Sequence, residues 1–295
     1  GALSAIDIAL WDVAGKALQV PTYQLLGGKV RDKVRLYLII GGNTVDDLVK
    51  EAVKAVKEGY TAVKFDPLPP NFHRVPYPRL FQEVVDRVRS VREAVGLDVD
   101  IVAEIHRKLG PGEAIALAQE LVPYRLYFYE DPIIHDSVDS MAEVARKVTI
   151  PMATGERLHT IYEFRELLEK RASQFVRPDV GLSGGLTHCK KIAALAESYH
   201  AQVVCHNFLS PLLTAATLQL GACVPNIPIQ EHVREDQPPR SELLKSPNRI
   251  EKGYMIVPDA PGLGVEVNEE VLDKYPFTPM GGHVPIREDG SVYGR

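Results

Sequence analysis

The chain has 295 residues, with 34 Lys and Arg against 39 Asp and Glu, and its formal net charge is −5. Hydrophobic residues make up 45% and charged residues 25%, which excludes a disordered or collagen-like chain. The acidic balance argues against a nucleic-acid partner, and no apolar run reaches the roughly 20 residues of a membrane helix, so we expect no membrane partner.

The first segment is predicted to be helical, because apolar residues recur at helical spacing from Leu3 to Ala17 and Pro21 then stops the helix. After it, short β-branched or aromatic runs alternate with segments of helical period. The predicted strands are 35–40, 61–65, 99–103, 126–129, 152–154, 175–177, 202–205 and 227–229. The predicted helices between them are 46–58, 79–95, 112–121, 138–147, 161–170, 186–199 and 211–220.

Alternation of strands and helices indicates parallel strands joined by right-handed crossovers, and eight strands are enough to close a (β/α)8 barrel of TIM type. An open, doubly wound sheet is the alternative. It would require a GxGxxG turn after an early strand, which Gly41-Gly42-Asn43 does not supply.

A polar residue ends almost every predicted strand, and from Glu104 onward these residues recur every 23 to 27 positions. They are Lys64, Glu104, Glu130, Glu156, Asp179, His206 and Glu231. The longer step after Lys64 contains the loop 66–78 with five prolines, which cannot be core. In a barrel all these strand ends open on the catalytic face.

Three acids, Glu104, Glu130 and Glu156, stand at consecutive strand ends. A single acid there commonly caps the following helix. Three carboxylates around one mouth repel one another unless a cation lies between them. Oxygen ligands favour a hard divalent ion, and the sequence therefore predicts one Mg²⁺ per chain.

His206 and Asp179 end neighbouring strands, and a carboxylate beside an imidazole orients it as a base. His106 lies two residues beyond Glu104, so we expect both side chains on the same side of the strand, with His106 as a general acid. Lys64, with Asp66 two residues beyond it, offers a positive group for a substrate carboxylate, and Glu231 closes the ring. The directions of His159 and His232 are not fixed by the sequence.

Two further features give weaker signals. Gly184-Gly185 opens a helix whose free N–H groups are able to hold an anion. Cys189, Cys205 and Cys223 contain no CxxC pair, which is typical of a reducing compartment, so we interpret them as buried thiols and expect the protein in the cytoplasm.

The order of these motifs resembles the mandelate racemase branch of the enolase superfamily over nearly the whole chain. The opening SAIDIALWDVAGKALQVPTYQLLGG is similar to the family's signature leading into the barrel. It is followed in the family's order by VKFDP, VAEIH, YEDP, TGER, RPDVGLSGG, CHN and PDAPGLGVEV.

The resemblance implies that the three Glu residues bind Mg²⁺ and that His206, activated by Asp179, removes the proton α to a carboxylate. His106 is similar to the general acid of the sugar-acid dehydratases, and Glu231 to the acid that hydrogen-bonds the substrate carboxylate or enediolate. The first metal ligand of the family is commonly Asp, whereas Glu104 is one methylene longer. The racemases use Lys-x-Lys on the second strand, and Asp66 replaces the second Lys.

These features predict a dehydratase of an aldonate such as gluconate or galactonate, which yields a 2-keto-3-deoxy acid. A racemase or epimerase of an α-substituted acid is the alternative on the same fold, and a non-catalytic barrel used for binding or assembly is the alternative of another class. Related proteins are usually homo-oligomers, so we expect one here, with a small-molecule sugar acid as the substrate.

We divide the chain into a helix and linker over 1–36, a catalytic barrel over 37–260 and a C-terminal segment over 261–295. No α+β segment precedes the barrel in this chain. The family's N-terminal cap domain is therefore expected to be missing from it, and the C-terminal segment is expected to return toward that domain.

Overall fold

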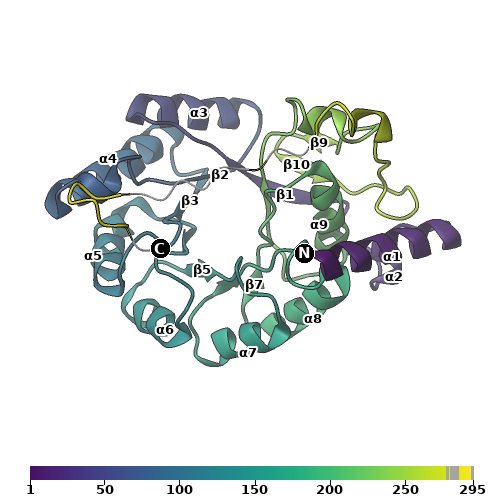
Figure 1. The fold of residues 1–295 in the computed structure, drawn as a ribbon, viewed down its shortest axis with the longest axis horizontal. Coiled ribbons are helices and arrows are strands. Elements are labelled where there is room, and N and C mark those ends of the chain that lie inside the picture. The colour runs from purple at the N-terminus through teal and green to yellow at the C-terminus, as the bar shows by residue number, and fades with distance from the viewer. Residues whose placement is uncertain (277–278, 280–285, 294–295) are drawn as a thin grey trace.

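The structure is a computed structural model, and it describes residues 1–276, 279 and 286–293. Eight short strands surround a common centre and are enclosed by helices (Figure 1). The strands are β1 Lys33–Ile39, β2 Ala62–Phe65, β3 Asp100–Glu104, β4 Phe128–Glu130, β5 Met152–Thr154, β6 Phe175–Val176, β7 Gln202–Val203 and β8 Gln230–His232. The predicted α/β barrel class is confirmed.

Parallel pairing runs from β1 through β7 in chain order, and β8 pairs with β1 in parallel. Within the described residues, β7 and β8 form no strand ladder. Individual hydrogen bonds connect the segments around these two strands instead. The Val203 N–H donates to the Asn226 carbonyl over 2.9 Å, and the Asn207 N–H donates to Glu231 Oε1 over 2.8 Å. These bonds bring the last strands together around the centre.

The helices follow the predicted positions closely, because N-caps fix where several of them begin. Thr44 and Thr160 form capping boxes with Asp47 and Glu163, and the Ser210 hydroxyl accepts from the Leu213 N–H. The helices are α1 Ala2–Leu18, α2 Thr22–Leu25, α3 Val45–Lys57, α4 Tyr77–Val95, α5 Pro111–Leu121, α6 Val138–Lys147, α7 Ile161–Glu169, α8 Gly185–Ser198 and α9 Pro211–Cys223.

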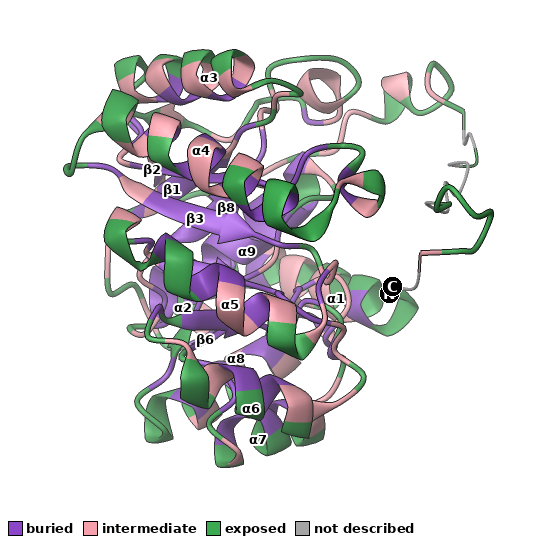
Figure 2. Cartoon of the chain, turned by 90° about the vertical axis from the view of Figure 1, so that its left-hand side faces the viewer, coloured by how far each residue is buried: buried purple, intermediate pink, exposed green. Residues whose placement is uncertain are grey.

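One buried apolar residue from each strand or its edge fills the inside of the barrel. These residues are Tyr37, Ala62, Val102, Phe128, Ala153, Phe175, Val204 and Ile229. A larger apolar cluster lies outside the strands, against the buried faces of the helices, and Figure 2 shows the strands buried beneath half-exposed helices. Each strand is thus covered on both faces, as parallel strands require.

Some predicted details are wrong. The last strand is Gln230–His232 rather than 227–229, because Pro228 has no N–H for a ladder and the pairing with β1 starts at Gln230. A hairpin of β9 Ile250–Glu251 and β10 Tyr254–Ile256 was not predicted. It pairs antiparallel with the first residues of β1, at the end of the barrel opposite the polar strand ends.

The N–H groups at the start of α8, which were expected to be able to hold an anion, are engaged by α1, and the anion that one of them binds is the carboxylate of Asp7. The Ser4 hydroxyl accepts from the Gly184 N–H over 3.0 Å, and the Asp7 carboxylate accepts from the Thr187 N–H over 3.1 Å. Trp11 Nε1 donates to the Thr187 hydroxyl over 2.7 Å. The first helix is thereby fixed to the rim of the barrel, and Figure 1 shows it beside α8.

The three cysteines are buried thiols, as predicted. Among the described helices, none combines the length and apolar character that crossing a membrane requires. The expected course of segment 261–295 concerns in part residues 277–278, 280–285 and 294–295, which lie outside the described residues, and it stays a prediction.

His232 points away from the barrel interior, since its neighbour Glu231 points inward, and its ring is 2% exposed and stacks on Tyr60 at 6.4 Å. Burial, with Arg234 and Arg240 nearby, lowers the pKa of His232 to about 4, although Asp236 acts in the opposite direction. Below about pH 6.5, His232 is therefore protonated in the unfolded chain but stays neutral in the folded protein until the pH approaches 4.

We predict that the free energy of unfolding falls as the pH decreases from about 6.5 toward 4, and that His232→Phe removes this contribution. Between pH 7.5 and 5 the wild type should lose about 2 kcal/mol more than the variant in urea titrations. The exposed His200→Gln serves as the control. Parallel stability curves for wild type and His232→Phe would contradict the prediction.

Candidate active site

A polar layer lies directly above the apolar layer inside the barrel. Two residues beyond each inward apolar residue the side chain faces the same way. This rule brings together Lys64, Glu104, Glu130, Arg177, His206 and Glu231 at the carboxyl ends of the strands. The corresponding position after β5 is Gly155, which has a φ of 126° and is followed by Glu156.

Glu104, Glu130 and Glu156 meet as predicted. One carboxylate oxygen from each lies within 4.8 Å of the others, and the three residues are 5%, 0% and 7% exposed. Glu130 Oε2 is buried and has no hydrogen-bond partner among the described residues. An unsatisfied carboxylate oxygen is costly, and three convergent oxygens suit a hard cation, so these residues fit Mg²⁺.

Lys64 lies among the carboxylates instead of projecting freely toward the cavity. Its amino group is 2.6 Å from Glu130 Oε1, 2.6 Å from Glu231 Oε2 and 2.8 Å from Glu104 Oε2. Burial acts to lower the pKa of Lys64, but the three carboxylates outweigh it and hold the pKa well above the usual value. The three carboxylates thus favour the protonated form of Lys64.

Arg177 is a second buried cation, which the sequence analysis missed. It is fully buried, with Nε 2.8 Å from Glu130 Oε1 and Nη2 2.8 Å from Glu231 Oε2. Its Nη1 donates to the Tyr37 hydroxyl over 2.6 Å. Its place two residues beyond Phe175 was a usable signal, because the same spacing identifies the other strand-end residues.

Arg107 and Asp131 were also missed. Arg107 Nη1 lies 2.9 Å from Asp131 Oδ2 and 2.5 Å from Glu156 Oε1, and thus links the third acid to β4. Burial and the charges of Glu104 and Glu156 raise the pKa of Asp131 to about 6. Arg107 and Asp131 both follow a strand end and have positive φ, so strand alternation gives no signal for them.

His206 and Asp179 form the predicted pair. His206 Nδ1 is 2.6 Å from Asp179 Oδ2, whereas Nε2 lies 3.6 Å from Glu156 Oε2 and 3.9 Å from Glu231 Oε1, and the residue lines a cavity. Burial acts to lower the pKa of His206, but the hydrogen bond with Asp179 and the charges of Glu231 and Glu156 outweigh it and raise the pKa above the usual value. The imidazole is held in a fixed orientation beside the acids.

Glu231 closes the ring but is 0% exposed. Its Oε1 accepts from the Asn207 N–H, and its Oε2 accepts from Tyr37, Lys64 and Arg177. Burial acts to raise the pKa of Glu231, but Arg177 and Lys64 outweigh it and hold the pKa well below the usual value. Glu231 is thus an ionised carboxylate that anchors both buried cations.

A cavity of about 280 Å³ lies above this ring. It is lined by Lys64, Glu104, Glu156, His206, Glu231, His106, Asp66, Ile39, Ile40, Phe65 and Phe208. His106 lines the cavity as predicted, but strand alternation is not the reason, because β3 ends at Glu104. Instead, His106 has a φ of 59° and its N–H donates to Glu104 Oε1 over 2.9 Å. His159 and His232 do not line it.

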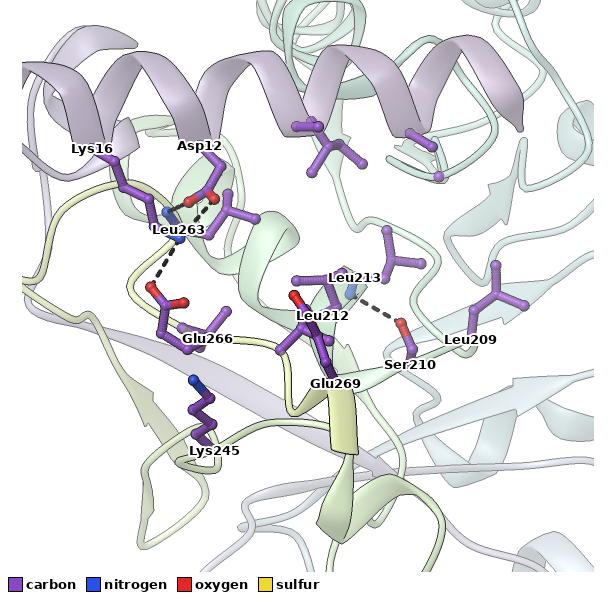
Figure 3. Close-up of a pocket in the computed structure, with 16 residues that line it drawn as sticks. Asp12, Lys16, Leu209, Ser210, Leu212, Leu213, Lys245, Leu263, Glu266 and Glu269 are labelled. Atoms are coloured by element: carbon purple, nitrogen blue, oxygen red, sulfur yellow. Dashed lines mark hydrogen bonds and ion pairs between the residues drawn. The ribbon is translucent and has the colours of Figure 1, made fainter. Parts of the chain in front are cut away.

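A larger cavity of about 560 Å³ lies outside the ring, between α1, the start of α9 and segment 263–269 (Figure 3). Lys16 bridges Asp12 and Glu266 at one side of it, and Leu209, Leu212 and Leu213 form an apolar side. It contains none of the ring residues. The chemistry of the strand ends therefore belongs to the smaller cavity.

Comparisons with known proteins agree with this geometry. The family model described as "Enolase C-terminal domain-like" matches residues 47–271, and that of the "Mandelate racemase / muconate lactonizing enzyme, N-terminal domain" matches residues 1–27. A D-gluconate dehydratase of Thermoproteus tenax is 36% identical over 98% of this chain and 58% of its own length. A D-galactonate dehydratase of Variovorax paradoxus is 34% identical over 99% of this chain and 78% of its own length.

Solved structures agree as well. A mandelate racemase/muconate lactonizing enzyme-like protein from Roseovarius superposes with a TM-score of 0.91 at 36% identity, covering 99% of this chain and 76% of that chain. The mandelate racemase/muconate lactonizing enzyme from Sulfitobacter gives a TM-score of 0.90 at 36% identity, over 95% of this chain and 74% of that chain. The chain therefore belongs to the mandelate racemase and muconate lactonizing enzyme family of the enolase superfamily.

Proposed function

We propose that the protein is a Mg²⁺-dependent dehydratase of an aldonate such as gluconate or galactonate. The observation that carries this proposal is that His206, paired with Asp179, lines the same cavity as the acids Glu104 and Glu156. Relatives named as gluconate, galactonate and mannonate dehydratases support it. The chain spans 58% of the length of the gluconate dehydratase, and the proposal therefore rests on the residues of the site.

His206 is the proposed base. Its Nδ1 is engaged by Asp179, which leaves Nε2 to accept the proton on C2 of the acid. A C–H bond beside a carboxylate is too weakly acidic for an imidazole unless the developing negative charge is stabilised. Glu104, Glu130 and Glu156 would hold Mg²⁺, which supplies that stabilisation by neutralising charge on the substrate's carboxylate.

His106 is the proposed acid. As the C3–O bond breaks, it donates the proton that lets the hydroxyl leave as water, and the enol that remains becomes the 2-keto-3-deoxy acid. Lys64, at the edge of the cavity, and Arg177, buried beneath it, are cations that offset part of the negative charge of the ring where the substrate's carboxylate would bind. Each of these groups lines the cavity or lies directly under it.

The same geometry favours elimination over racemisation. A racemase needs a base on each face of C2, and Lys64 is the basic side chain on the second strand. Three carboxylates hold Lys64 protonated, so it has no free electron pair to accept a proton. Asp66 stands where racemases have a second Lys, and it does not replace that Lys as a base because it forms an ion pair with Lys108. A homo-oligomeric state and a cytoplasmic location stay predictions from the sequence.

We predict that His206→Asn lowers kcat on an aldonate panel by at least about a hundredfold, because it removes the base. Product is measured as the 2-keto-3-deoxy acid, and substrate recovered from D₂O is analysed for exchange at C2. Asp179→Asn should lower kcat less, because the base remains but loses its orienting partner. Full turnover by His206→Asn would refute the base assignment, and exchange with inversion but no keto acid would indicate a racemase.

We predict that the protein binds one Mg²⁺ per chain in calorimetry and that Glu104→Gln weakens this binding at least about tenfold, because one anionic ligand is lost. The surface variant Glu169→Gln is the control and should bind as the wild type does. Chelation with EDTA should abolish turnover, and added Mg²⁺ should restore it. Equal Mg²⁺ affinity in Glu104→Gln and wild type would exclude the three-acid site.

A further inference from the structure

We propose that Asp66 recognises the hydroxyl groups of the substrate beyond C3, with Lys108 as its positioning residue, and so selects aldonates by length and configuration. This inference rests on the proposed function. The reaction uses atoms C1 to C3 only, and the residues assigned to it lie at the floor of the cavity or, for His106, next to the first acid. Asp66 lines the same cavity and has no role in that chemistry.

The position of Asp66 follows from the strand geometry. Ala62 belongs to the apolar layer and Lys64 to the charged ring, and Asp66 directly follows Phe65, the last residue of β2, and lines the cavity. Asp66 therefore lies beyond Lys64, toward the open end of the barrel. A substrate whose carboxylate lies at the ring therefore extends its remaining carbons past Asp66.

Asp66 is held in place from two sides. Its Oδ1 accepts from the Leu68 N–H over 2.9 Å, and its Oδ2 forms an ion pair with Lys108 Nζ. Both side chains are partly exposed, at 31% for Asp66 and 20% for Lys108. A carboxylate has about four acceptor sites, so Asp66 keeps capacity for hydroxyl donors from a ligand.

Lys108 is itself fixed by neighbouring segments. Its amino group lies 5.2 Å from the centre of the Phe72 ring, and its carbonyl accepts from the Tyr293 hydroxyl over 2.7 Å. Tyr293 in turn packs edge-on against Phe72 at 5.0 Å. Two segments, around Phe72 and Tyr293, thus hold Lys108 beside Asp66, whereas an isolated surface ion pair has no such support.

Apolar side chains in the cavity wall make Asp66 more selective. Ile39, Ile40, Phe65 and Phe208 also line the cavity and offer no polar side-chain atoms. A hydroxyl group that loses water in such surroundings costs free energy unless it finds an acceptor. Substrates that place a hydroxyl at Asp66 are therefore favoured over those that do not.

The test uses Asp66→Asn in the full-length protein with Mg²⁺. The panel comprises glycerate, which has no hydroxyl beyond C3, threonate, xylonate and gluconate. We expect kcat/KM on gluconate to fall about 10- to 100-fold, mainly through KM, and the loss to shrink as the acid shortens. For an acid that is bound but not converted, its inhibition constant gives the same comparison.

Lys108→Met should lower kcat/KM for the same substrates by a smaller factor. Lys147→Met, which removes the exposed pair with Glu143 on α6, is the matched control and should leave the panel unchanged. Unfolding temperatures measured for each variant separate recognition from stability, since a purely structural role would lower activity on all acids alike.

The outcomes distinguish the two proposals. Turnover of aldonates by the wild type, with equal losses on short and long acids in Asp66→Asn, overturns the role of Asp66 and leaves the dehydratase proposal intact. No turnover and no binding of any aldonate by the Mg²⁺-loaded wild type overturns both.

Discussion

Compensation of buried negative charge is the constraint on which the upper end of this barrel depends. All six buried acidic side chains in the described part of the chain lie at the strand ends: Glu104, Glu130, Asp131, Glu156, Asp179 and Glu231. Left unpaired, such a cluster would be too costly to bury. Lys64 and Arg177 lie among them and neutralise only part of the charge, which leaves the ring suited to one more cation.

Much of this ring could be predicted from the sequence, because a strand points every second residue inward. Glu104, Glu130 and His206 each stand two residues after an inward apolar residue, so the residues that carry the chemistry have a fixed relation to the barrel core. The family motifs independently pointed to the same positions. Boundaries of most helices could be predicted equally well, since capping residues such as Thr44 and Thr160 mark their starts.

What could not be predicted depends on contacts between distant segments. Arg107 contacts Glu156, which is 49 positions away in the sequence. It follows a backbone turn with positive φ, which the spacing of apolar residues does not predict. The β9–β10 hairpin is held by the start of β1, more than 200 positions earlier in the chain. The partners of Lys64 could not be predicted either. Strand alternation indicates that its side chain points inward, but not that three carboxylates contact its amino group.

The contact between α1 and the start of α8 has an evolutionary consequence. Gly185 has a φ of 76°, and a Cβ on it would lie 2.6 Å from the Cβ of Asp7. Asp7 needs that space in order to reach the Thr187 N–H. A larger residue at either position thus requires a change at the other, and among homologues these two positions, 178 residues apart in the chain, are expected to covary as a pair.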